Sequence, residues 1–141
     1  MARFPGISDA ASLALHALSL FAKKHAILLS TREVAELLDV SEAHLAKVLQ
    51  RLNRSGLVVS VRGPGGGFTL AKPAEKVTLL EVYEAIEGPM DQSTCLLRKP
   101  VCPEGKCILG DLLKSMNAQV KDRLSQTTLA DAAGSFGSER E

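Results

Sequence analysis

The chain of 141 residues is long enough for one domain with an apolar core, or for a small domain with an appendage. Aromatic residues make up 4% of it and tryptophan is absent, so leucine, valine and alanine must fill the core, which favours a mainly helical protein. No apolar run is long enough to span a membrane, and His16 and Ser19 interrupt the apolar stretch near the N-terminus, unlike in a signal peptide. We therefore expect a cytoplasmic protein with no membrane partner.

The net charge of +1 conceals a difference between two parts of the chain. Residues 23–76 carry nine Lys and Arg residues and five acidic ones, whereas the rest of the chain carries eight basic and eleven acidic residues. A basic part joined to an acidic part is typical of a nucleic-acid-binding module attached to a module for sensing or assembly.

Three helices are predicted in the first 55 residues. The first runs over 8–24 and is expected to be buried on much of its surface. Ser30 and Glu33 form a capping box in front of a short second helix, which ends before a turn at Asp39. A third helix is expected over 41–55, with Ser41 as its cap.

The third helix is predicted to be amphipathic. Its apolar residues follow one stripe, made of Leu45, Val48, Leu49 and Leu52. Short polar and basic side chains cover the opposite face, as reading of a DNA major groove requires, although a solvated face is the alternative. On this helix the predicted DNA contacts are Glu42, His44, Lys47 and Arg51. The predicted phosphate anchors are Ser41, at the start of this helix, and Thr31, at the start of the second helix.

A hairpin with a tip rich in glycine is predicted next. Two short apolar runs, Leu57–Val61 and Phe68–Ala71, flank this tip. A tip with few side chains can approach a sugar–phosphate backbone closely, and Arg62 beside it would enter a minor groove, although an ordinary exposed hairpin is the alternative. Helix, turn, helix and hairpin together predict a winged helix-turn-helix DNA-binding domain over 1–77. Its predicted tip contacts are Arg62, Gly63, Pro64, Gly65 and Gly66.

The second part of the chain, 78–132, is predicted to hold a linker helix, an irregular cysteine loop (90–107) and a long helix. The linker helix begins with a capping box at Thr78. The long helix is expected from about Cys107 to Ser125, with a stripe of Leu109, Leu113, Met116, Val120 and Leu124. So long a helix has little of its own domain to pack against, so we expect dimerisation through it, an internal core helix being the alternative. Residues 133–141 are expected to form a disordered tail.

All three cysteines, Cys95, Cys102 and Cys107, lie in the cysteine loop. Their odd number and the absence of an export signal argue against a disulfide framework. Thiolates on a loop that can bend around a cluster are typical iron–sulfur ligands, whereas zinc fits less well because structural zinc sites usually show a C-x2–4-C knuckle and four strong ligands. The alternative is a set of inert or redox-active thiols. No enzymatic function is expected, because neither a phosphate-binding loop nor a catalytic triad can be assembled.

The chain resembles the Rrf-type family of bacterial transcription regulators, which includes iron–sulfur regulators of the IscR, NsrR and RirA kinds. The most specific part of the resemblance is Gly56–Phe68, and Thr78–Gly88, the three cysteines and Thr128–Asp131 support it. The resemblance implies a homodimer of winged helix-turn-helix subunits whose long C-terminal helices cross. It also implies that Cys95, Cys102 and Cys107 hold an iron–sulfur cluster.

The fourth ligand distinguishes branches of this family. IscR-like regulators place a histidine where this chain has Gly110. The segment around Asp9 instead resembles the nitric-oxide-sensing branch, in which an aspartate of the partner subunit completes the coordination. Asp9 is therefore the expected fourth ligand, and the alternative is an acid that only stabilises the first helical turn. On the same resemblance a [4Fe–4S] cluster is favoured over a [2Fe–2S] cluster.

These observations together predict a mainly α homodimer that represses transcription. We expect it to bind a palindromic operator in double-stranded DNA and to sense nitric oxide, redox state or iron through its cluster. The alternative is a winged-helix regulator without a cluster, controlled by thiol redox chemistry or by a partner protein.

Overall fold

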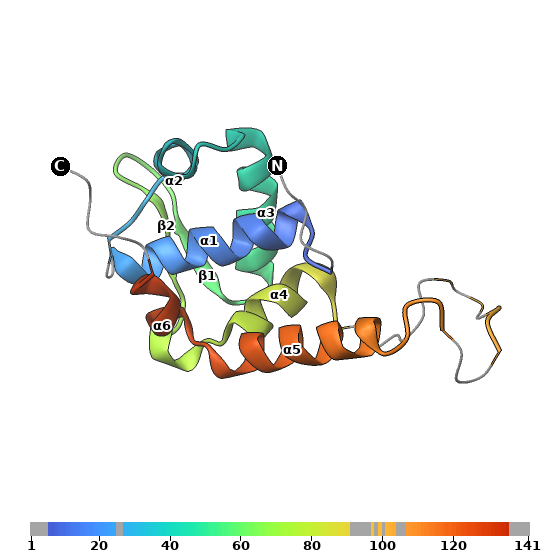
Figure 1. The fold of residues 1–141 in the computed structure, drawn as a ribbon. Coiled ribbons are helices and arrows are strands. Elements are labelled where there is room, and N and C mark those ends of the chain that lie inside the picture. The colour runs from blue at the N-terminus through green and yellow to red at the C-terminus, as the bar shows by residue number, and fades with distance from the viewer. Residues whose placement is uncertain are drawn as a thin grey trace.

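The computed structural model of the chain describes residues 6–24, 27–90, 97, 99, 101–103 and 107–135. The fold is mainly helical with one two-stranded sheet, which confirms the predicted winged helix-turn-helix architecture (Figure 1). The elements are α1 (Asp9–Lys23), α2 (Thr31–Leu38), α3 (Glu42–Arg54), β1 (Val58–Val61), β2 (Gly67–Leu70), a 3-10 turn η1 (Ala74–Lys76), α4 (Leu79–Glu87), α5 (Leu112–Gln126) and α6 (Leu129–Ala133). Among these helices, none is long and apolar enough to cross a membrane.

Hydroxyl side chains fix where most of the helices begin. Each cap oxygen accepts a hydrogen bond of 3.1–3.3 Å from the backbone N–H three residues later, and the caps are Ser8, Ser30, Ser41, Thr78 and Thr128. Such a cap typically contributes about 1 kcal/mol to helix stability. The predicted helix starts after Ser30, Ser41 and Thr78 are therefore confirmed.

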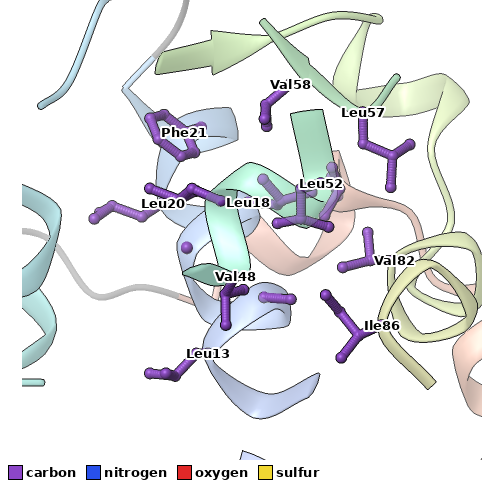
Figure 2. Close-up of a cluster of buried hydrophobic side chains, with 14 of the residues drawn as sticks. Leu13, Leu18, Leu20, Phe21, Val48, Leu52, Leu57, Val58, Val82 and Ile86 are labelled. Carbon is purple, nitrogen blue, oxygen red and sulfur yellow. The ribbon is translucent and has the colours of Figure 1, made fainter. Parts of the chain in front are cut away.

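The core forms around α1, which packs against α3, α4 and α6 (Figure 2). Its alanines at positions 11, 14 and 17 are fully buried, so neighbouring helices can approach it closely. The predicted apolar stripe of α3 is buried as expected, with Leu45, Val48, Leu49 and Leu52 at most 2% exposed. One face of α3 is thereby held in the core, and the other is left at the surface.

The hairpin β1–β2, which we call the wing, is joined to the rest of the domain at its base. Its strands are antiparallel, with Val58 opposite Leu70 and Val61 opposite Gly67. The N–H of Leu29 donates to the carbonyl of Phe68 at 3.1 Å, and the N–H of Phe68 donates to the carbonyl of Leu29 at 2.8 Å. The segment in front of α2 therefore acts as a short third strand.

The wing tip is a tight turn that depends on glycine. The N–H of Gly66 donates to the carbonyl of Gly63 at 2.9 Å, and Gly63 and Gly65 have φ of 99° and 73°. A Cβ atom on Gly66 would lie 2.2 Å from the carbonyl oxygen of Val61. The tip therefore has no room for a side chain at position 66.

The helix α5 begins later than the sequence predicts. Residues 107–111 form turns, in which Gly110 has a φ of 59° and its N–H donates to the carbonyl of Cys107 at 3.0 Å. The predicted start at Cys107 is therefore wrong, because a left-handed residue cannot continue a right-handed helix. Only Leu124 of α5 is buried, and the helix lies along α4 (Figure 1).

A short helix that the sequence analysis did not predict, α6, returns the chain to the core. Thr128 and Asp131 form its capping box. The N–H of Leu129 donates to the carbonyl of Val77 at 2.8 Å, and the side chain of Leu129 is fully buried. Of the predicted tail, Ala133 belongs to α6, and 136–141 lie outside the described residues.

The lack of room for a side chain at Gly66 can be tested by measuring the stability of a substituted protein. Gly66→Ala is expected to lower the free energy of unfolding by about 1–3 kcal/mol, because the new methyl group meets backbone atoms that must shift. Gly134→Ala is the matched control, because a Cβ there would come no closer than 3.4 Å to another atom. Urea unfolding measures both variants, and equal stability of the two would contradict the tight turn.

Candidate nucleic-acid interface

The surface of α3 presents the side chains expected of a recognition helix. Glu42, His44 and Lys47 are exposed, as are Arg51 and Arg54 near its end. The Ser41 oxygen accepts the N–H of His44 at 3.3 Å, so the Ser41 hydroxyl can still donate to a phosphate. The first two turns of α3 thus offer the short polar and basic groups that read base edges and phosphates.

The predicted phosphate anchor Thr31 lies at the start of α2. Ser30, not Thr31, is the cap of this helix, and its oxygen accepts the N–H of Glu33 at 3.1 Å. Thr31 is the first helical residue and is half-buried. Unpaired N–H groups and the helix dipole favour an anion at such a position.

The wing presents Arg62 beside the narrow glycine tip. Arg62, Gly63, Pro64 and Gly65 are exposed, and Gly66 is half-buried. In Figure 1 the tip lies at the same edge of the molecule as α2 and the start of α3, and α5 lies at the opposite edge. The structure therefore brings α2, the start of α3 and the wing tip to one side.

Arg51 is engaged differently from the other predicted DNA contacts. Its guanidinium donates a hydrogen bond to the backbone carbonyl of Ile86, in the last turn of α4. The side chain of Arg51 therefore reaches toward a neighbouring helix. No local pattern in the sequence could show this contact, because 35 positions separate the two residues.

Two of the three cysteines belong to the described residues. Cys102 and Cys107 are half-buried free thiols, whereas Cys95 lies outside the described residues. The Sγ of Cys107 accepts the backbone N–H of Leu109 at 3.4 Å, and hydrogen bonds to sulfur of this kind tune iron–sulfur centres. The chemistry of these donors fits a cluster, although no group of three potential metal ligands occurs in the described part of the chain.

The cysteine loop and the beginning of α5 carry an exposed apolar patch. Val101 is 75% exposed and Ile108 is 85% exposed. The other members of the patch are Leu97, Leu109 and Leu112. Large apolar side chains that are exposed in one stretch of the chain are candidates for an interaction surface.

Asp9, the expected fourth ligand, is the first residue of α1. Ser8 provides the cap of this helix, so Asp9 is not needed for that role, although its charge suits the helix dipole. Asp9 lines a cavity of about 450 Å³ between α1 and the α2–α3 turn. The cavity is also lined by Ser12, Leu13, His16, Leu38, Asp39, Val40, Ser41 and His44.

Sequence relatives of the chain are transcription regulators. The Rrf2 family model, described as "Iron-dependent Transcriptional regulator", matches residues 7–135. A protein of Aquifex aeolicus named as an HTH-type transcriptional regulator is 33% identical over 127 residues, which is 88% of each chain. IscR of Erwinia tasmaniensis is 33% identical over 100 residues, which is 70% of this chain and 60% of IscR.

Solved structures of regulators share the fold. CymR, the global cysteine regulator of B. subtilis, superposes with a TM-score of 0.77 at 27% identity, covering 97% of this chain and all of CymR. The oxidised form of Staphylococcus aureus CymR gives a TM-score of 0.69 at 27% identity, covering 94% of this chain and 98% of that one. The chain therefore belongs to the Rrf2 family of DNA-binding transcription regulators and is not an enzyme.

Proposed function

We propose that the chain is a repressor that places α3 in the major groove and the wing in the adjacent minor groove of its operator. The observation that carries this proposal is that Arg62 is exposed beside a glycine tip, and that this tip lies at the same edge of the molecule as the start of α3 (Figure 1). Residues 1–77 would bind DNA, and residues 78–132 would sense the signal and form the dimer.

The exposed surface of α5 supports a homodimer. This helix has 15 residues, of which only Leu124 is buried within the chain. Its first residue, Leu112, is 52% exposed, and Leu113, Met116 and Val120 are half-buried. A second copy of α5 would cover these apolar groups, and a two-fold dimer reads a palindromic operator.

The cysteine loop supports control by an iron–sulfur cluster, with [4Fe–4S] favoured and [2Fe–2S] as the alternative. Cys95, Cys102 and Cys107 would hold it, and Asp9 of the partner subunit would complete the coordination. When bound, the cluster supplies a centre that reacts with nitric oxide or oxidants and responds to iron supply. The cavity beside Asp9 and the exposed apolar side chains of the loop are the surfaces that we expect to meet in such a contact between subunits.

A second candidate is a regulator without a cluster, whose thiols respond directly to oxidants. The half-buried free thiols of Cys102 and Cys107 favour it. So does the likeness to CymR of Staphylococcus aureus, whose structure is known in an oxidised form. In this case oxidation of the loop, or binding of a partner protein, would change the affinity for DNA.

The wing assignment predicts a loss of DNA affinity in Arg62→Ala. Binding to a duplex selected by the wild-type protein from random sequences should weaken by roughly 1–3 kcal/mol, because a groove contact is lost. Fluorescence anisotropy measures the affinity. Lys76→Ala is the control, because Lys76 is also exposed but lies on η1, outside the predicted DNA contacts and the proposed dimer helix. Unchanged affinity in Arg62→Ala would contradict the wing assignment.

The cluster assignment predicts a visible absorption band and bound iron in protein purified without oxygen. Asp9→Asn should form a cluster that is lost faster in air, because a charged oxygen ligand is removed. Asp39→Asn is the matched control, since Asp39 lines the same cavity and asparagine tolerates its φ of 54°. Protein that is colourless and free of iron after reconstitution would favour the thiol candidate.

A further inference from the structure

The positively charged side chain of Arg51, on α3, contacts the last turn of α4. Arg51 donates to the carbonyl of Ile86, which is one of the four final carbonyls of α4. The last carbonyls of a helix generally lack partners within the helix, and a positive charge beside them interacts favourably with the helix dipole. In α4 the carbonyl of Glu84 accepts the N–H of Gly88 at 2.8 Å, whereas the carbonyl of Ile86 accepts from Arg51. Arg51 thus acts as a C-terminal cap supplied by a different helix.

The same turn of α4 also holds the beginning of α1. The hydroxyl of Tyr83 donates to the carbonyl of Gly6 at 2.9 Å, and the hydroxyl of Ser8 donates to Glu87 Oε1. Ser8 is the cap of α1 and precedes the candidate ligand Asp9. The segment that would present Asp9 is therefore attached to the turn that Arg51 contacts.

The chain leaves this turn directly toward the cysteines. Gly88, with a φ of 79°, ends α4, and Pro89 follows it. Only a few residues then separate the helix from Cys95. A change in the position of the cysteine loop can therefore act on the end of α4, as it can on the beginning of α5, which follows Cys107.

The contact also lies close to the DNA-reading surface. Lys47 precedes Arg51 by one helical turn, so both project from neighbouring positions of the same helix. In Figure 1 the end of α4 lies between α3 and the beginning of α5. A shift of the last turn of α4 would consequently act on α3 one helical turn from Lys47.

We infer that Arg51 is a positioning residue that ties α3 to the last turn of α4 and so transmits the state of the cysteine loop to the DNA-reading surface. This inference rests on the proposed function. It assigns Arg51 a role other than the base or phosphate contact that its sequence position predicts. Coupling of this kind requires that both sites bias one structural element, here the end of α4.

The test compares wild-type protein with Arg51→Gln, Arg51→Lys and Lys47→Gln. Affinity for the duplex selected by the wild-type protein is measured by fluorescence anisotropy over a range of salt concentrations. It is measured both for protein reconstituted with iron and sulfide and for chelator-treated protein. For the wild type we expect the DNA affinities of the reconstituted and the chelator-treated protein to differ by roughly fivefold or more, which gives an affinity ratio for each variant. For Arg51→Gln this ratio should fall toward one, whereas the slope of log affinity against log salt should stay unchanged.

The other variants distinguish a contact between α3 and α4 from a contact with DNA. Arg51→Lys should retain most of the ratio, because an ammonium group can also donate to the Ile86 carbonyl. Lys47→Gln should keep the ratio but reduce the slope by about 0.9, the value for one lost phosphate contact. If Arg51→Gln is too unstable to measure, Arg51→Met keeps the aliphatic stem and takes its place.

A reduced salt slope in Arg51→Gln, together with an unchanged ratio, would overturn the inference and make Arg51 a DNA contact. Equal affinity of the two wild-type forms would overturn control by the cluster, and the transmitting role of Arg51 with it. In that case the slope of log affinity against log salt concentration for Arg51→Gln still gives the role of Arg51. An unchanged slope indicates a contact between the two helices, and a reduced slope indicates a phosphate contact. The failure of the proposed function is thus distinguishable from the failure of the tie.

Discussion

Burial of one stripe of α3 against the core is the interaction on which the rest of the structure depends. Leu45, Val48, Leu49 and Leu52 are almost completely excluded from solvent, and α3 packs against α1, α2 and α4. A helix has one orientation that buries such a stripe, so its opposite face must point outward. The polar and basic side chains of α3 are exposed for this reason, and the α2–α3 turn and the wing are positioned relative to them.

The wing gains its own position from a different constraint, which is backbone pairing. The bridge between Leu29 and Phe68 joins the hairpin to the segment before α2, and Gly67 permits the close approach, since a Cβ there would lie 2.5 Å from the Leu29 carbonyl oxygen. Arg62 therefore extends from a fixed base and not from a free loop. The wing tip and the start of α3 lie at one edge of the molecule, and α5 lies at the opposite edge (Figure 1).

Local features of this fold could be predicted from the sequence, and features that depend on distant contacts could not. The caps at Ser41 and Thr78 are local, because the side chain and the N–H that it accepts are three residues apart. The helix α6 depends on the pairing of its entry with Val77, and its capping box alone did not reveal it. The start of α5 was misplaced because apolar periodicity continues through residues 107–111, whereas Gly110 takes a left-handed conformation.

The candidate site also has residues that local sequence patterns predicted and residues whose contacts depend on distant parts of the chain. Lys47 and Arg62 were found from periodicity and turn chemistry, and both are exposed as expected. The role of Arg51 depends on a helix 35 positions away in sequence. The proposed cluster ligands come from two subunits. The sequence of one chain therefore indicates which side chains can bind a cluster, but not how the two subunits bring them together.

The central claim, that α3 and the wing together read DNA, is tested most directly by amide hydrogen exchange of the protein with and without its selected duplex. We expect bound DNA to slow exchange in residues 41–50 and 62–67 and to leave residues 112–126 unchanged. Protection confined to α5, or absent from the wing, would contradict the account.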